Sequence, residues 1–504
     1  MGKEKKLIFN LTGYVLLAAA AVFGTVIMLQ TFSGDIWYDE VFSVRFVKDG
    51  WKDIVAYTIK DVHPPLYYFY LKMCTGIFGF LGIVTAGKIA SVIPLFVMLL
   101  ISVIYVRKRY GTIEMGIFAL LVTVMPQMAV YYSEIRMYSL ALVFITVAGI
   151  MLIDIVDEER SKPWKWAVFF VFSLCAAYTQ YFTAVAAAGL YIVLLIYYLI
   201  PANRNRKKIW GVGGMIAGSA VAYLPWLPSF IKQVKTVKGS YWIQPMTLRS
   251  IPGCLKFIFL PVSGEGNVTY LAAGFTIAVC ALVYIVFLFG KKKPKGTENV
   301  AAFSGIAALI LIVMVGFAAT VLKSPIFTYR YMVPVLGLFY LGIVAALNKT
   351  SKTYLYFAVI LAVLFTGYLS VNGFCYEEQK KIDEFEKASQ VLSDIPNGSV
   401  IISNFDHVVT ISSFYLPDSN IYQYEGEPDK LVEEMFPNYE SMVNDEAVRQ
   451  LIKDNSNVFF FGSFVSRDEI VQNWDDIKIT SEYEGECLVE RYWFNIYRLG
   501  LRDE

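Results

Sequence analysis

Long apolar stretches separated by short polar loops occupy about the first three quarters of the chain. Eleven of these stretches approach the ~20 residues that an α-helix needs to cross the hydrocarbon core of a bilayer. The first is longer than the apolar core of a usual signal peptide, so we predict that it is an uncleaved span. The predicted spans are residues 7–30, 86–106, 113–129, 135–156, 166–180, 182–200, 209–228, 268–290, 299–321, 328–347 and 353–373.

A further apolar run, residues 66–82, decides the topology. It carries Lys72 and three glycines, and if it spans the bilayer every later loop changes side. If it lies in the interface instead, all basic loops fall on one side, as the positive-inside rule expects. We therefore predict a juxtamembrane helix on the outer face, about eleven spans, a cytoplasmic N-terminus and an extracytoplasmic C-terminus. The basic loops contain Lys3–Lys6, Arg107–Arg109, Arg160–Lys165, Arg204–Lys208, Lys291–Lys295 and Lys349–Lys352.

The last part of the chain is polar and contains no predicted span. Residues 374–504 are expected to form an extracytoplasmic α/β domain, while residues 1–373, with an outer-face loop at 31–85, form the membrane domain. Apolar runs bounded by turn residues predict strands, and amphipathic patterns predict helices. The predicted strands are 399–403, 457–462 and 493–499, and the predicted helices are 376–388, 441–453 and 466–474.

Composition supports the membrane assignment and excludes several functions. The 504-residue chain is 57% hydrophobic and 17% charged, whereas soluble domains are about 45–50% apolar and about 25% charged. Its net charge of +2 and the lack of a basic stripe exclude nucleic acid as a partner. Six cysteines and two histidines without ligand spacing exclude a His/Cys zinc cluster. Cys375 and Cys487 are expected to be unpaired thiols rather than a disulfide, because the chain uses so little cysteine.

Two neighbouring acids, Asp39 and Glu40, open the first polar loop between aromatic residues. One interpretation is a solvated pair that caps a helix beginning near Val41. The other is catalytic, because carboxylates at the edge of a bilayer are costly to desolvate and are usually functional. Transfer of a sugar needs a carboxylate to take the proton from the acceptor hydroxyl, and Asp39 is the preferred candidate.

The motif Asp61-Val62-His63-Pro64-Pro65 follows in the same loop. Its prolines fix the start of the next helix, and that structural role alone is one interpretation. The functional interpretation places Asp61 and His63 beside Asp39, where they orient hydroxyls or hold a phosphate or a divalent ion. A single histidine does not make a metal site by itself.

Two arginine-bearing segments begin predicted spans at the outer face. In Tyr131–Tyr138, Arg136 suits a lipid phosphate, and Tyr132, Glu134 and Tyr138 are candidate substrate contacts. Arg330 begins a later span, where a fixed cation stabilises a departing phosphate. For both segments the alternative is a charged side chain that snorkels to the interface.

Together these motifs resemble the GT-C superfamily of membrane glycosyltransferases. The similarity is to bacterial glycosyltransferase family 39, relatives of protein O-mannosyltransferase and of the lipid A aminoarabinose transferase, and it covers about residues 1–370. The resemblance implies a polyprenyl-phosphate-linked donor, Asp39 as the general base, and Glu40, Asp61 and His63 as supporting groups. It also implies that Arg136 and Arg330 hold the donor phosphate. Some relatives use a divalent cation and others do not, so the metal is left open.

The sequence therefore predicts a hexosyl- or pentosyltransferase of the bacterial plasma membrane. It would move a sugar from the polyprenyl-phosphate donor to an extracytoplasmic acceptor: a lipid, a cell-envelope glycan or a protein. The alternative is a transporter or flippase of lipid-linked sugars. Transporters usually bury their charges near the midplane and between repeated halves, whereas the charges of this chain gather at one face and no repeat is evident.

Overall fold

The computed structural model describes residues 3–32, 36–237, 243–262, 266–291, 293–322, 324–426, 430–489 and 491–502. The chain divides into two compact units. The membrane unit contains Met1–Phe32 and Thr58–Tyr376, and the sheet unit contains Ser33–Tyr57 and Glu377–Glu504. Residues 33–57, which we expected in the outer loop of the membrane domain, thus cluster with the C-terminal part.

The membrane unit is a bundle of helices, and each predicted span corresponds to a helix. Among the described residues, eight helices are long and apolar enough to cross a membrane, and the bent pair α12–α13 makes a ninth candidate. The other two predicted spans are α7, with 13 residues, and α10, with 17 residues, so the total of eleven stays a prediction. The bundle contains α1 (Lys3–Gln30), α5 (Ile83–Ile101), α6 (Arg107–Arg109), α7 (Thr112–Val124), α8 (Met128–Ser133), α9 (Tyr138–Val156), α10 (Pro163–Thr179), α11 (Tyr181–Leu199), α12 (Arg206–Tyr223), α13 (Leu227–Val237), α14 (Ser250–Phe259), α15 (Asn267–Phe289), α16 (Gly296–Val321), α17 (Val333–Thr350) and the first part of α18 (Thr353–Ser393).

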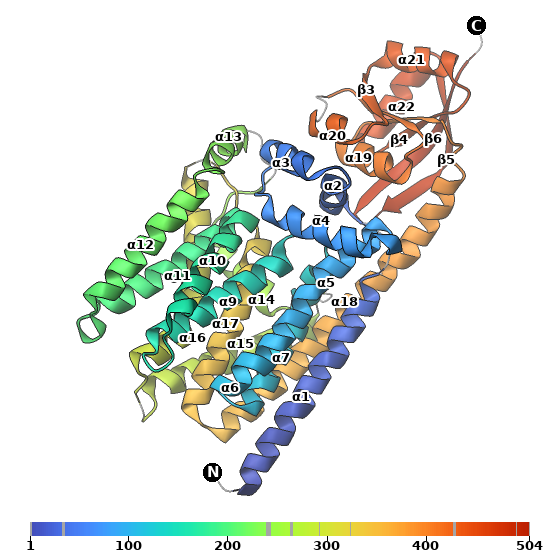
Figure 1. Ribbon diagram of the computed structural model, residues 1–504. Coiled ribbons are helices and arrows are strands. Elements are labelled where there is room, and N and C mark those ends of the chain that lie inside the picture. Colours follow the sequence, from blue (N-terminus) through green and yellow to red (C-terminus); the bar gives the residue numbers. More distant parts are fainter. Residues whose placement is uncertain are drawn as a thin grey trace. The chain divides into compact units, whose positions relative to one another are not determined.

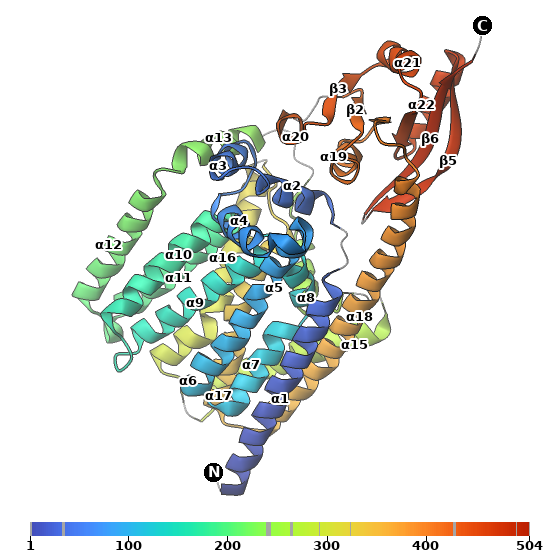
Figure 2. The same cartoon turned by 45° about the vertical axis from the view of Figure 1, so that its right-hand side comes forward.

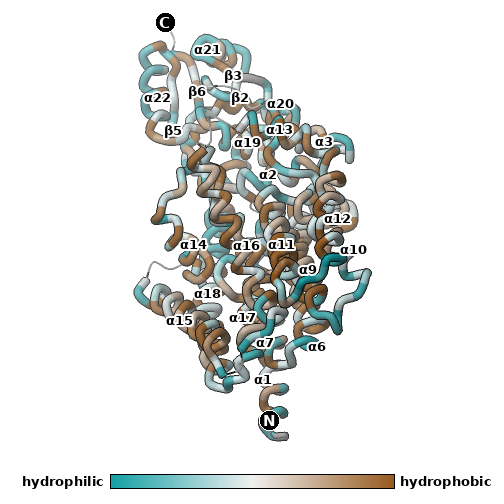
Figure 3. The backbone as a smooth tube through the Cα atoms, turned by 90° about the vertical axis from the view of Figure 1, so that its left-hand side faces the viewer, coloured by the Kyte–Doolittle hydropathy of each residue, from teal (hydrophilic) through white to brown (hydrophobic). Residues whose placement is uncertain are grey.

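Glycines let the central helices approach each other closely. A Cβ on Gly305 of α16 would lie 2.6 Å from the backbone of Phe339 in α17, and a Cβ on Gly149 of α9 would lie 2.4 Å from the Leu338 side chain. Small residues at such contacts are the usual means by which membrane helices gain van der Waals packing, since lipid supplies no hydrophobic drive between them. Accordingly α9 and α17 are almost completely buried. Figure 3 shows apolar residues along both the central and the outer helices of the bundle.

The run at 66–82 forms α4 (Leu66–Phe78) and a 3₁₀ turn, Gly79–Leu81. Gly82, at φ 94°, then turns the chain into α5, and Figures 1 and 2 show α4 lying across one end of the bundle. This direction fits the predicted interfacial helix, while the side of the membrane on which it lies stays a prediction. We call this end of the bundle the site end.

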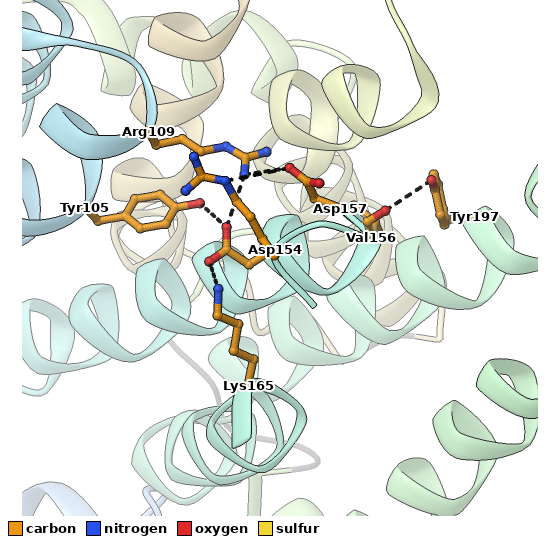
Figure 4. Close-up of polar contacts among 8 residues, drawn as sticks. Tyr105, Arg109, Asp154, Val156, Asp157, Lys165 and Tyr197 are labelled. Carbon is orange, nitrogen blue, oxygen red and sulfur yellow. Dashed lines mark hydrogen bonds and ion pairs between the residues drawn. The ribbon is translucent and has the colours of Figure 1, made fainter. Parts of the chain in front are cut away.

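The opposite end, which we call the basic end, carries the basic loops and a buried ion cluster (Figure 4). Asp154, at the end of α9, accepts hydrogen bonds from Lys165 of α10 and from Tyr105 (2.9 Å), and Arg109 lies 3.5 Å away. Arg109 also pairs with Asp157 at 2.8 Å. Tyr105 belongs to a π-helical turn, Ser102–Val106, between α5 and α6.

The sheet unit has a six-stranded sheet of order β3-β2-β1-β4-β6-β5. The first four are parallel, and β5 and β6 form an antiparallel hairpin against β4. The strands are β1 (Val400–Ser403), β2 (Asn420–Tyr424), β3 (Tyr439–Val443), β4 (Val458–Gly462), β5 (Ile479–Val489) and β6 (Tyr492–Leu501), and the helices are α19 (Asp406–Tyr415), α20 (Lys430–Met435), α21 (Asp445–Asp454) and α22 (Ser466–Asp476).

Predicted and observed elements of this unit agree in part. The strands β1, β4 and β6 confirm their predictions, as does α22. The predicted helix 441–453 is wrong at its start, because Tyr439–Val443 is strand β3 and α21 begins at Asp445. The predicted helix 376–388 is the second part of the 41-residue α18. Cys375 and Cys487 are free thiols.

Two short helices from the first loop complete the sheet unit. These are α2 (Tyr38–Phe46) and α3 (Trp51–Lys60), of which α3 crosses the boundary between the units at Thr58. Helix α2 packs against α19, and the Ile36 amide donates to the Tyr415 hydroxyl at 3.0 Å. The Arg45 guanidinium donates to the Met435 carbonyl. These contacts attach the segment that carries Asp39 to the sheet.

Candidate functional site

An interruption between two helices forms the centre of the site end. Helix α8 ends at Ser133 and α9 begins at Tyr138, and the Arg136 amide donates to the Glu134 carbonyl at 2.7 Å between them. The interruption buries the side chains of Glu134 and Arg136, which are 9% and 3% exposed. Irregular backbone at membrane depth is tolerated only where protein surrounds it or a cavity lies beside it, and there it is commonly part of a site.

A short polar chain connects this segment to the Asp61 motif. Nδ1 of His63 lies 2.9 Å from Oδ2 of Asp61, and Nε2 of His63 lies 3.4 Å from Nη2 of Arg136. Asp61 and His63 follow α3, and Pro65 is the N-cap of α4, as the two prolines predicted. The structure thus brings together three candidates that lie up to 75 positions apart in the sequence, since Arg136 and Asp61 differ by 136 − 61 = 75.

The Asp61 carboxyl is ionised at neutral pH. Burial raises its pKa, but the charge and hydrogen bond of His63, the Val62 amide and the charge of Arg136 together lower the pKa below the ordinary value. A carboxylate paired with the δ nitrogen of a histidine fixes the orientation of the ring. The ε nitrogen of His63 is thereby directed to the Arg136 side of the site.

Arg330 reaches the same region from a 3₁₀ turn, Tyr329–Met332, that precedes α17. Its guanidinium lies 5.8 Å from the centre of the Tyr138 ring, and Tyr138 contacts Tyr131 edge-to-face at 5.1 Å. A guanidinium over a ring face keeps its charge while the ring covers one side of it. The second predicted arginine is therefore connected through Tyr138 to the interrupted segment.

Tyr132 points elsewhere. Its hydroxyl donates to the Val122 carbonyl of α7 at 3.1 Å and is buried. This contact connects α8 to the end of α7 and is a packing contact.

Two further polar residues of the site end, Lys88 and Gln233, were not predicted from the sequence. Lys88 is 4% exposed near the start of α5, and its neighbour Gly87 packs against Ile135 of the interruption. Gln233 is 3% exposed, donates to the Thr58 carbonyl at 2.6 Å and accepts from Tyr181. For Lys88 a signal was available, because an ionisable residue within an apolar stretch is by default a functional hypothesis.

The acids Asp39 and Glu40 lie in the first turn of α2, in the sheet unit. The helix begins at Tyr38 rather than near Val41, so the predicted role of Asp39 as N-cap is wrong. Glu40 is 1% exposed, and its carboxylate accepts from the Trp37 amide at 3.3 Å, which closes the helix N-terminus. Asp39 is half-buried. Of the two acids, Glu40 has the structural role and Asp39 is the more accessible.

The described residues of this site do not form a recognisable metal-binding cluster. Within the part of the chain that the structure describes, no group of three or more His, Cys, Asp or Glu side chains is arranged to hold a metal ion. The site end combines the cations Arg136, Lys88 and Arg330 with the carboxylates of Asp61 and Glu134, and the cations suit an anionic ligand.

The fold is similar to that of a protein of known structure. No protein-family model matches the sequence, and neither does any curated protein. ArnT from Cupriavidus metallidurans bound to undecaprenyl phosphate matches with a TM-score of 0.60 and 12% identity, over 96% of this chain and 97% of that chain. The same protein in the apo state matches with a TM-score of 0.48 and 13% identity, over the same shares of the two chains. The chain thus has an ArnT-like fold along nearly its whole length.

Proposed function

We propose that this chain is a glycosyltransferase that uses a polyprenyl-phosphate-linked sugar as donor and an extracytoplasmic molecule as acceptor. The observation that carries the proposal is the partly buried chain Asp61–His63–Arg136 at one end of a multi-pass bundle that has the ArnT fold. ArnT was crystallised with undecaprenyl phosphate, and a similar lipid suits the cations of this chain. The membrane is proposed to be the bacterial plasma membrane, with the basic end in the cytoplasm.

The arginines are proposed to hold the donor phosphate. Arg136 and Arg330 reach the site end from two different segments, and Gly87, the neighbour of Lys88 in α5, packs against Ile135, the neighbour of Arg136. As the bond between the sugar and the phosphate breaks, negative charge collects on the phosphate oxygens. Fixed cations stabilise that charge and cost no reorganisation during the reaction. His63, oriented by Asp61, would position a phosphate oxygen or a sugar hydroxyl.

Asp39 is proposed as the general base. Its carboxylate takes the proton of the acceptor hydroxyl while the hydroxyl oxygen attacks the anomeric carbon. The new bond forms between that oxygen and the anomeric carbon, and the old bond to the phosphate oxygen breaks with its electron pair on the phosphate. Asp39 is favoured over Glu40 because the Glu40 carboxylate is buried against the start of α2.

Transfer of labelled sugar from synthetic polyprenyl-phosphate donors, with the full chain in lipid nanodiscs, tests this function. A crude envelope extract serves as the source of acceptors, and an EDTA arm reports any need for a divalent cation. We expect transfer by the wild type and loss of transfer in Asp39→Asn at unchanged folding. The matched control is Asp53→Asn, an acid of α3 that lies outside the proposed site.

Two results would end the proposal. Equal turnover in Asp39→Asn would remove Asp39 as base. Movement of the labelled donor across the bilayer without any transfer would instead identify a flippase.

A further inference from the structure

A hollow lies at one edge of the sheet unit. It encloses about 370 Å³ at the carboxyl ends of β1 and β2 and reaches the start of α22, and that volume is within the range of about 300–1,000 Å³ usual for small-molecule sites. Along the chain, β2 and β3 are added on one side of β1, and β4 then lies on the other side. In open α/β sheets, ligands bind in the crevice outside the carboxyl ends of the strands where the strand order reverses.

The polar lining of the hollow is acidic and rich in acceptors. Asp406 and Glu425 supply carboxylates, Gln423 an amide and Ser466 a hydroxyl, and no lysine or arginine is among the described residues that line it. Burial raises the pKa of Asp406, but the hydrogen bonds and charge of His407 and two backbone amides lower it below the ordinary value, so Asp406 is ionised at neutral pH. A ligand for this lining offers hydroxyl or ammonium donors, and the two carboxylates repel anionic ligands.

Aromatic rings adjoin the same edge. Phe405 stacks on His407 with ring centres 4.7 Å apart, and Phe464 meets Phe405 edge-to-face at 4.8 Å. The Phe464 side chain is 63% exposed, and an apolar ring in contact with water is stabilised when a ligand covers it. Exposed rings beside carboxylates and amides suit a sugar, whose C–H face packs on a ring while its hydroxyls bind the polar groups.

The backbone at this edge is strained. Phe464 and Glu425, which follow β4 and β2, both have left-handed conformations, with φ of 59° and 52°. Such conformations in residues other than glycine persist where the surrounding structure holds them, and they cluster at ligand sites. Neither residue is needed to fill the core, because both side chains are exposed.

The hollow is adjacent to the proposed base within the same unit. Asp406 lines the hollow and holds His407 at 2.7 Å, and the His407 ring stacks on Tyr38 at 3.9 Å. Tyr38 directly precedes Asp39 in α2. The hollow is therefore connected, through Asp406 and His407, to the turn that carries the base.

We propose that this hollow binds the carbohydrate part of the acceptor, a neutral or amino-bearing glycan, and thereby presents its hydroxyl to Asp39. This inference rests on the proposed function and names the acceptor class of that function. The pair Asp406–His407 and the stacked Tyr38 then position Asp39 relative to the bound sugar.

Saturation-transfer NMR on the full chain in nanodiscs, without any donor, tests the binding. The probes are methyl glucoside, methyl glucosaminide and methyl glucuronide, which are neutral, cationic and anionic at neutral pH. We expect saturation of the C–H protons of the first two probes and about tenfold weaker binding of the glucuronide. Glu425→Gln and Phe464→Ala are expected to weaken the binding of methyl glucosaminide by about tenfold each.

Both substitutions are at exposed positions, and their controls lie on β5, away from the hollow. Glu482→Gln and Tyr483→Ala change the same kinds of side chain and are expected to leave binding unchanged. Equal binding in all variants, preference for the glucuronide, or no saturation from any probe would each overturn the inference. If the chain transfers sugar, for example onto a polypeptide, but binds no glycoside, the glycan-binding role of the hollow is refuted and the proposed function stands. Glycoside binding by a chain with no transfer would refute the proposed function and leave the hollow as a glycan site.

Discussion

Two buried polar clusters of the membrane unit, one at each end of the bundle, have opposite designs. At the basic end, Asp154 receives Lys165, Tyr105 and Arg109 from three helical segments, so one acid is surrounded by donors. At the site end, Asp61 contacts a histidine two positions away, and the line of contacts then reaches Arg136. The first cluster is a cross-link among helices. The second ends in the cation of Arg136, which belongs to the irregular segment between α8 and α9. Buried charge alone therefore does not mark a reaction site, and the way in which the charges are compensated distinguishes the two ends.

The largest effect is expected at the basic end. Asp154→Asn leaves Lys165 and Arg109 buried beside a neutral amide, and loss of one partner from a buried ion pair costs about 3–5 kcal/mol. We expect a corresponding drop in the free energy of unfolding, measured by denaturation in detergent, and unchanged transfer per folded molecule. The control Asp475→Asn removes an exposed ion pair with Arg502 and should cost about 1 kcal/mol or less. Normal stability of Asp154→Asn would show that the two clusters do not differ in this way.

At the site end the expected effect is on chemistry. Arg136→Gln keeps a polar side chain but removes the charge proposed to stabilise the leaving phosphate, which should lower transfer about 10²–10³-fold. The measurement is initial transfer rate against donor concentration, normalised to folded protein. Arg204→Gln, an exposed arginine of a basic loop, is the matched control. A variant that unfolds while its turnover per molecule stays normal would assign Arg136 to structure instead.

A smaller effect is expected from pH. The lowered pKa of Asp61 means that its contribution to stability is complete above its unfolded value of about 3.9 and is lost as pH falls through the folded value. The melting temperatures of wild type and Asp61→Asn should therefore differ by a constant amount above about pH 5 and converge below about pH 4. Thermal unfolding followed by tryptophan fluorescence provides the curves. A gap that widens in acid would contradict the assignment of a stabilised carboxylate.

The smallest effect concerns the second acid–histidine pair, Asp406–His407 of the sheet unit. His407→Phe keeps a ring against Tyr38 but loses the bond to Asp406, while His407→Ala loses both contacts. Aromatic pairs contribute about 0.5–1.5 kcal/mol, so the alanine variant should be less stable than the phenylalanine variant by about that amount. Denaturant unfolding of the full chain measures the difference, and equal stability would mean that the stack with Tyr38 does not hold α2.

Much of the fold could be predicted from the sequence because long apolar runs and the basic loops are strong, independent signals. The interruption at Glu134–Met137 was predicted in part, because its two charges mark the start of a span that we placed at residue 135. The segment contains neither glycine nor proline, so the start of α9 at Tyr138 was not predictable. Strand β2 was missed because Asn420–Tyr424 mixes polar residues into a short run, and β5 because as an edge strand it is polar on one face.

The sequence indicated which residues belong to the candidate site better than it indicated which of them are in contact. The spacing of Asp61 and His63 indicated their contact, whereas the contact of His63 with Arg136 depends on the packing of distant helices. The attachment of Asp39 to the sheet unit had no sequence signal, because α2 packs on α19, which lies more than 350 positions later.

The π-helical turn at Ser102–Val106 sets the rotational phase of the end of α5. A wide turn of this kind accommodates one residue more than a regular helix, and each residue of an α-helix advances the side chains by about 100°. Deleting a single residue from this turn would restore regular α-helical geometry. The side chains on one side of the deletion would then be rotated by about 100° relative to those on the other side. Tyr105 would then no longer face Asp154, so a shorter chain with a smoother helix would lose the cross-link at that end of the bundle.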